Sequence, residues 1–125
     1  GSPMLVKTQV EEKQGQGVVD TIMQKITVSA SANKSLGYIP AGWRLDDISI
    51  DRTTQPSSNV TFNIGSTTAG TNIVNGFVHD RTFTSDTLQP ILRKYFSKDS
   101  QQEVFISSSA WNSGVFDITL TFRRV

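Results

Sequence analysis

Strict alternation of apolar and polar residues near the C-terminal end of the sequence constrains the fold more than any other feature. Phe116, Ile118, Leu120 and Phe122 are separated by single polar residues. Successive side chains of a β-strand point to opposite faces, so this run predicts a strand with one face in a core and the other in solvent. Shorter runs with the same alternation occur at 26–29, 47–51 and 60–64.

Weaker strands are expected at 36–39, 73–78 and 102–108, with clusters of Gly, Pro, Asn and Ser between the runs. Seven or eight short strands with this spacing predict an all-β fold. The expected architecture is an antiparallel β-sandwich, jelly-roll-like, over residues 21–125. The segment 86–96 is ambiguous: Asp86 suits the cap of a short helix, but Pro90 follows one turn later, and we favour a turn followed by a strand over 91–96.

The N-terminal residues have a different character. Residues 1–3 (GSP) precede Met4 and are interpreted as a cloning scar, outside the fold. Residues 4–20 contain few large apolar side chains and a Gln-Gly-Gln-Gly stretch. They predict an extended N-terminal arm, loosely held unless it docks on something.

The composition excludes several classes of function. The absence of cysteine excludes disulfides, thiolate catalysis and Cys-ligated zinc. Twelve basic against eleven acidic residues give a net charge of +1, so no basic field exists to attract nucleic acid. No apolar run approaches the ~20 residues of a membrane helix, and no signal peptide is recognised, so membrane insertion is not expected. The 15 Ser and 14 Thr make the chain polar but weakly charged.

Candidate catalytic and metal-binding residues are few. His79 is the only histidine, and its neighbour Asp80 points the other way in an extended segment, so we expect an exposed turn histidine rather than the base of a triad. Alternation places Asp47 and Asp51 on one strand face and Asp46 on the other. We therefore expect solvated carboxylates that discourage edge pairing, not a cation site. No acid pair is marked for glycoside hydrolysis, and we expect no enzyme, metal or cofactor.

Two segments are candidates for ligand binding. Residues 65–71 (GSTTAGT) follow a strand but lack the Gly-Lys-Ser/Thr ending of a phosphate-binding loop, so we interpret them as a hairpin connection. Trp111 and Asn112 are candidate glycan contacts, because an exposed aromatic ring beside polar neighbours offers stacking area and hydrogen bonds. The alternative for Trp111 is a plug for the sandwich core or for a subunit interface. Glycosylation sequons at 33–35 and 59–61 arise easily by chance in such a Ser/Thr-rich chain.

Three segments resemble small β-sandwich domains of bacteriophage virion appendages. Residues 39–48 (IPAGWRLDDI) resemble their IPAGY-x-[IL]-x-x-I opening, residues 64–74 (IGSTTAGTNIV) are similar to their IGTTAGGTDVV hairpin, and residues 110–122 are similar to their closing segment. The resemblance covers about residues 36–125 and consists mostly of turn residues, so it transfers no catalytic residue. Such domains occur as head fibres, capsid decoration proteins or tail-fibre tips, usually as trimers.

The resemblance implies a non-enzymatic virion protein that forms a homotrimer. It also implies attachment to a capsid or fibre-shaft protein through the arm at 4–20, and a surface for a receptor or glycan. A polar, weakly charged surface is compatible with this, because it can pack against copies of itself without burying many charges. The alternative is a carbohydrate-binding module of a secreted or cell-surface protein, with Trp111 and Asn112 in its site. A small hydrolase is the third and weakest hypothesis.

Overall fold

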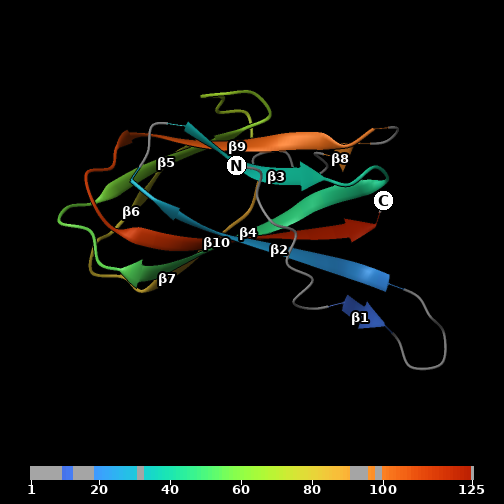
Figure 1. The fold of residues 1–125 in the computed structure, drawn as a ribbon, viewed down its shortest axis with the longest axis horizontal. Helices are drawn as coiled ribbons and strands as arrows, with labels where there is room; N and C mark the ends of the chain where they lie inside the picture. Colours follow the sequence, from blue (N-terminus) through green and yellow to red (C-terminus); the bar gives the residue numbers. More distant parts are fainter. Residues whose placement is uncertain (1–9, 13–18, 31–32, 91–95, 98–99, 125) are drawn as a thin grey trace.

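The computed structural model describes residues 10–12, 19–30, 33–90, 96–97 and 100–124. This part of the chain consists of strands and their connections, arranged as two antiparallel sheets packed face to face (Figure 1). None of these residues belongs to a helix capable of crossing a membrane. The all-β sandwich predicted from the alternating runs is therefore confirmed.

The first sheet has the order β1-β2-β10-β4-β7, and β8 also pairs with β4. Its strands are β1 (Val10–Glu12), β2 (Val19–Ser29), β4 (Trp43–Thr54), β7 (Ser85–Leu88), β8 (Phe96–Ser97) and β10 (Val115–Arg124). The second sheet has the order β3-β9-β5-β6, with β3 (Asn33–Ile39), β5 (Val60–Gly65), β6 (Val74–His79) and β9 (Gln102–Ala110). From β2 to β5 every connection crosses between the sheets, then β5 and β6 form a hairpin, which gives the jelly-roll-like winding.

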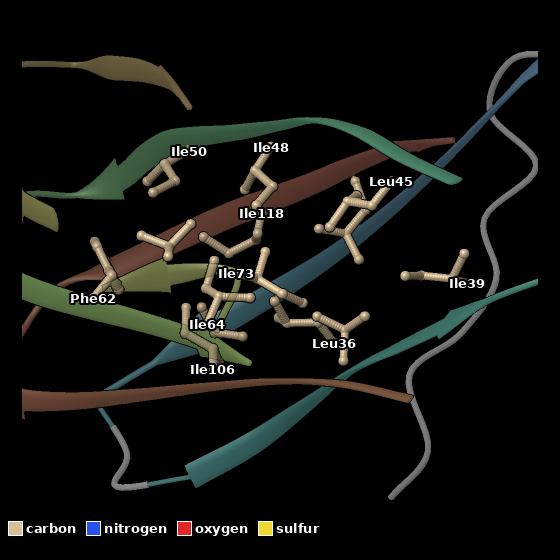
Figure 2. Packing of buried hydrophobic residues seen from close by; sticks show 14 of the residues in the cluster. Leu36, Ile39, Leu45, Ile48, Ile50, Phe62, Ile64, Ile73, Ile106 and Ile118 are labelled. Atoms are coloured by element: carbon tan, nitrogen blue, oxygen red, sulfur yellow. The ribbon is translucent and has the colours of Figure 1, made fainter. Parts of the chain in front are cut away.

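The core fills the space between the two sheets, as the alternation predicts. All four apolar residues of the β10 run are fully buried. Aliphatic side chains of β4 lie beside them, and the second sheet supplies the facing layer (Figure 2). The residues in this layer include Phe62, Ile64 and Ile106. The other face of β10 carries Asp117 and Thr119, which are partly exposed, and Thr121, which is buried.

A bulge in β4 changes the expected positions of its aspartates. Leu45 and Asp47 pair with consecutive residues of β10, which leaves Asp46 as an extra residue on β4. Asp46 accepts a 3.0 Å hydrogen bond from Nε of Arg123 and lies 3.8 Å from Nη2 of Arg44. The prediction that strict alternation separates Asp46 from Asp47 is wrong, because the bulge removes both from the buried row.

A polar side chain occupies a core-facing position where β2 passes β3. Gln24 is only 4% exposed, and its Nε2 donates a 2.6 Å hydrogen bond to the carbonyl oxygen of Leu36. Gly37 lies directly against it with a φ of 104°, and a Cβ added there would overlap Nε2 of Gln24. The pairing of β3 with β9 shifts register between Ser35 and Gly37, so the glycine sits in a β-bulge.

The segment 86–96 and the N-terminal arm are each described only in part. Asp86 lies inside β7, so no helix begins there. The strand expected over 91–96 falls outside the described residues except for Phe96. Within the expected arm, β1 pairs antiparallel with β2, while residues 1–9 and 13–18, including the expected cloning scar, are not among those described.

Candidate functional site

Three connections meet at one end of the sandwich, on the left in Figure 1. They join β4 to β5, β6 to β7 and β9 to β10. We call this end the loop end and define it as residues 55–59, 80–84 and 111–114. The strand β2 starts at the opposite end, where it pairs with the last residues of β10. The start of β2 and the loop end are therefore separated by the length of the sandwich.

Trp111 closes the core at the loop end. Its ring centroid lies 5.1 Å from that of Phe62 and 5.7 Å from that of Phe116, in edge-to-face arrangements. Its Nε1 donates a 3.4 Å hydrogen bond to the carbonyl oxygen of Gly114. Part of the indole remains exposed, and the neighbouring Asn112 is exposed as well. The two predicted glycan contacts thus share one loop, and the contact itself stays a prediction.

The loop that carries Trp111 is fastened to the loop between β4 and β5. The hydroxyl of Ser113 accepts a 2.9 Å hydrogen bond from the backbone N–H of Ser57 and donates to its hydroxyl at 3.0 Å. Gly114 has a φ of 102°, and a Cβ added there would lie 2.8 Å from Cβ of Pro56. A surface held in one conformation before binding loses less entropy when a partner arrives.

The loop between β6 and β7 is fastened to the same neighbour through Arg81. Its backbone N–H donates to Oδ1 of Asn59 at 2.9 Å, and its Nε donates to the carbonyl oxygen of Pro56 at 3.3 Å. The carbonyl oxygen of Arg81 accepts hydrogen bonds from Arg52 Nη1 at 2.8 Å and Gln55 Nε2 at 3.0 Å. Four contacts on one residue fix the position of this loop.

The tip of the same loop is a tight turn that exposes an aromatic side chain. Oδ1 of Asp80 accepts hydrogen bonds from the hydroxyl of Thr82 at 2.7 Å and from its backbone N–H at 2.9 Å, and these contacts lower the pKa of Asp80. The backbone N–H of Phe83 donates to the carbonyl oxygen of Asp80 at 2.9 Å. Phe83 is nevertheless 54% exposed. Phe83 was not predicted from the sequence, because a single aromatic among polar residues shows no periodicity.

His79 is fully buried, so the predicted exposed turn histidine is wrong. Its Nδ1 lies 2.5 Å from Oδ2 of Asp86, and its ring packs edge-on against Phe116 with centroids 5.0 Å apart. Asp80 was the carboxylate considered from the sequence, but the true partner comes from β7, across the turn. The pair joins β6 of one sheet to β7 of the other.

The His79–Asp86 pair has the orienting half of a catalytic triad but offers no nucleophile. In a triad, the second ring nitrogen of histidine hydrogen-bonds the attacking hydroxyl. Nε2 of His79 is buried and has no hydrogen-bond partner in the described structure. The T-shaped contacts with Phe62 and Phe116 surround the ring with apolar groups instead. This arrangement suits a structural link between sheets.

The other two candidate sites have structural explanations. Residues 66–71 belong to the connection between β5 and β6, as predicted, and Gly65 is the last residue of β5; the connection is closed by a pair of hydrogen bonds between Ser66 and Asn72. Asp46 is paired with arginines. Within the described ranges, no group of three or more His, Cys, Asp or Glu side chains is placed to hold a metal ion.

An apolar groove of about 510 Å³ lies between β6 and β7. Its apolar lining comes from Ile73, Val74, Phe77 and Leu88, and the polar residues Asn75, Thr87 and Gln89 complete it. The first two are buried, whereas Phe77 and Leu88 are half-buried. We call this feature the edge groove, because each of the two strands is the last in its sheet.

No protein-family model matches the chain, and no curated protein matches its sequence. Solved structures match its fold. A chain from the capsid of Ralstonia phage GP4 has a TM-score of 0.65 at 9% identity, over 99% of this chain and 97% of that chain. A chain from the cyanophage Pam1 capsid asymmetric unit has a TM-score of 0.58 at 11% identity, over 98% of both chains. At such low identities the likeness establishes a shared fold.

Proposed function

We propose that this chain is a non-enzymatic structural protein of a phage virion, located on the capsid as a head fibre or decoration protein, or at a fibre tip. The observation that carries the proposal is the fold match to chains from two phage capsids over nearly the full length of each. The likeness of residues 39–48 and 64–74 to virion appendage motifs points to the same class from the sequence. Fold alone does not fix function, so the two lines of support matter together.

The geometry of the chain supports attachment through the arm at 4–20. The arm leads into β2 at the end of the sandwich opposite the loop end. An arm bound to a capsid or fibre-shaft protein therefore directs the loop end away from the attachment point. The same protein forms a homotrimer, in keeping with the usual state of the appendage domains it resembles.

The outward-directed loop end supports a role in binding a receptor or glycan. Trp111 and Asn112 lie there on a loop fastened by Ser57 and Ser113. Aromatic anchors among small polar residues, held rigidly, are typical of surfaces that bind varied partners. This observation also favours the second candidate function, a carbohydrate-binding module of a secreted or cell-surface protein.

The absolute mass in solution, measured by light scattering on a sizing column, tests the assembly. We expect three copies per particle for the full chain, and we compare it with a chain lacking residues 4–20. A trimer that survives the deletion places the contact in the sandwich, whereas a trimer lost with the arm makes the arm the assembly element. A monomer in both samples contradicts the trimeric appendage and favours the binding module.

A glycan screen tests the binding surface. Asn112→Ala removes the exposed amide without touching the core, and Trp111→Phe keeps an aromatic plug against Phe62. We expect both changes to weaken any glycan bound by the wild type. Gln101→Ala, an exposed change outside the loop end, serves as the control. Equal binding by all four proteins contradicts the glycan site.

A further inference from the structure

We propose that Asn75 and Gly76 form a site of self-modification, where the chain converts its own asparagine to aspartate and isoaspartate through a cyclic imide, and that Asn63 slows this reaction. The site lies in β6, at the edge of the second sheet. The inference is independent of the virion role, because the other reactant is water.

The reaction needs an asparagine whose side chain is within reach of the next backbone nitrogen. That nitrogen bonds to Cγ of the asparagine, the bond from Cγ to Nδ2 breaks, and ammonia leaves with the proton that the nitrogen gives up. Water then opens the ring. Opening at Cγ gives aspartate, whereas opening at the main-chain carbonyl carbon gives isoaspartate. No oxidant or reductant takes part in either step.

The sequence singles out one asparagine for this chemistry. Asn75 is followed by glycine, whereas the other asparagines of the chain are followed by lysine, serine, valine or isoleucine. Glycine has no Cβ, so its nitrogen is the least crowded and its backbone is the least restricted. A β-branched residue restricts the same nitrogen most strongly.

The fold leaves this dipeptide outside the regular ladder of β6. The pairing of β5 with β6 shifts register between Phe62 and Ile64, so a single residue of β5 lies opposite both Asn75 and Gly76. This is a β-bulge, in which the extra residue lacks a partner in the ladder. Gly76 has a φ of 72°, as a bulge of this kind requires. The backbone of the dipeptide is therefore held less firmly than the rest of the strand.

The surroundings of the dipeptide are open. Asn75 and Gly76 are both exposed, so water and solvent bases reach them. A Cβ built on Gly76 would meet no atom within 4 Å apart from its chain neighbours. The rotation that brings Cγ of Asn75 toward the nitrogen of Gly76 therefore has room.

One hydrogen bond restrains the attacking nitrogen. The backbone N–H of Gly76 donates to Oδ1 of Asn63 at 2.8 Å. Attack on Asn75 requires this nitrogen to lose its proton and to turn toward Cγ, and both changes break the bond to Asn63. The side chain of Asn63 therefore sets the rate at which the native protein reacts.

Two other asparagines show the opposite arrangement. Oδ1 of Asn59 accepts a hydrogen bond from the backbone N–H of Arg81, and Oδ1 of Asn72 accepts one from that of Ser66, each at 2.9 Å. In both cases the asparagine side chain itself is held. Such an amide cannot swing toward the following nitrogen without losing its partner, so we expect both residues to persist.

The products change the edge of the sandwich. Asn75 belongs to the lining of the edge groove, which is otherwise apolar or uncharged, so aspartate brings a negative charge to it. Isoaspartate also lengthens the main chain of β6 by one carbon. The pairing of β6 with β5 should therefore be weaker in aged protein than in fresh protein.

Storage of the purified protein in mildly alkaline buffer at physiological temperature, followed by peptide mass mapping, measures conversion at each asparagine. We expect Asn75 to convert at least tenfold faster than Asn112, which is exposed and followed by serine and is the most demanding comparison. Asn75→Gln keeps an amide but lengthens the side chain, so it should abolish the fast conversion. Conversion at Asn75 that is no faster than at Asn112 overturns the site.

A second comparison tests the hydrogen bond of Asn63. Asn63→Ala removes the acceptor for the N–H of Gly76 and should speed conversion of Asn75 at least threefold. Thr61→Ala, on the same strand but opposite Val78, is the matched control and should leave the rate unchanged. Thermal melting checks that both variants fold. An unchanged rate in Asn63→Ala, or an equal rise in both variants, overturns the role of Asn63.

Discussion

Replacing Gly37 by alanine tests whether the interior of the sandwich is built around the buried amide of Gln24. The new Cβ would occupy the position of Gln24 Nε2, and the backbone at φ 104° disfavours any side chain. The strained backbone costs about 1–3 kcal/mol. Displacement of Gln24 leaves the carbonyl oxygen of Leu36 buried without its donor, which costs about 1–3 kcal/mol more. We therefore expect a loss of about 2–6 kcal/mol in the free energy of unfolding.

Urea unfolding at a fixed protein concentration measures this loss, because the proposed self-assembly would make stability depend on concentration. A double variant that combines Gly37→Ala with Gln24→Ala removes the overlap between the new Cβ and Nε2 of Gln24. Gln24→Ala alone loses the hydrogen bond to Leu36. In the double variant the hydrogen bond to Leu36 is lost only once, and the new Cβ no longer meets Nε2 of Gln24. The loss in the free energy of unfolding of the double variant should therefore be smaller than the sum of the two single losses by about 1–3 kcal/mol. Strictly additive costs, or a loss below about 0.5 kcal/mol for Gly37→Ala, the usual range of surface changes, would refute the reasoning.

Three further predictions concern the core, the turn at the loop end and the link between sheets. Leu120→Ala should lower the free energy of unfolding by about 2–5 kcal/mol because Leu120 is fully buried. Thr119→Ala, on the opposite face of β10, should change it by no more than about 0.5 kcal/mol. Equal losses for the two variants in urea unfolding would mean that the buried face was assigned wrongly. Thr82→Val removes a hydroxyl donor from Asp80 and should move the pKa of that carboxyl back toward its ordinary value in an NMR titration. Because the folded pKa lies below the unfolded one, the stabilisation by Asp80 is complete above the unfolded pKa and is lost as the pH falls through the folded value. Asp86→Ala leaves the buried His79 ring without its hydrogen-bond partner and should lower the free energy of unfolding by about 1–3 kcal/mol. Adding His79→Phe should recover part of this loss. No recovery would contradict a polar link between the sheets.

The fold was predictable from the sequence where the apolar or polar character of a residue indicates whether it faces the core or the solvent. The β10 run shows its buried face directly, since each apolar residue is followed by a polar one. The bulge at Asp46 was missed although the sequence marks it: two consecutive aspartates separate Leu45 from Ile48, which shifts the alternation by one residue. Gln24 was missed for a related reason: a glutamine in an alternating strand reads as outward-facing unless its backbone acceptor on Leu36 is known.

The candidate surfaces were only partly predictable, because they depend on which segments meet. The loop of Trp111 and Asn112 stood out from its aromatic and amide residues. The pairing of His79 with Asp86 crosses a turn, and proximity in sequence favoured the wrong carboxylate. The edge groove exists because β6 and β7 end their sheets on the same side, and strand order is not written in any single segment.

The central position of β10 sets the order in which the protein can form. Residues 115–124 lie between β2 and β4, and the hydrogen bond from Thr27 to Asp117 joins residues 90 positions apart. During synthesis, β2 and β4 therefore leave the ribosome long before the strand that connects them. Non-local pairing of this kind gives a high contact order and slow folding. Until β10 emerges, the nascent chain exposes the apolar side chains and unpaired edges of β2 and β4. The low charge of the chain gives little protection against aggregation at this stage.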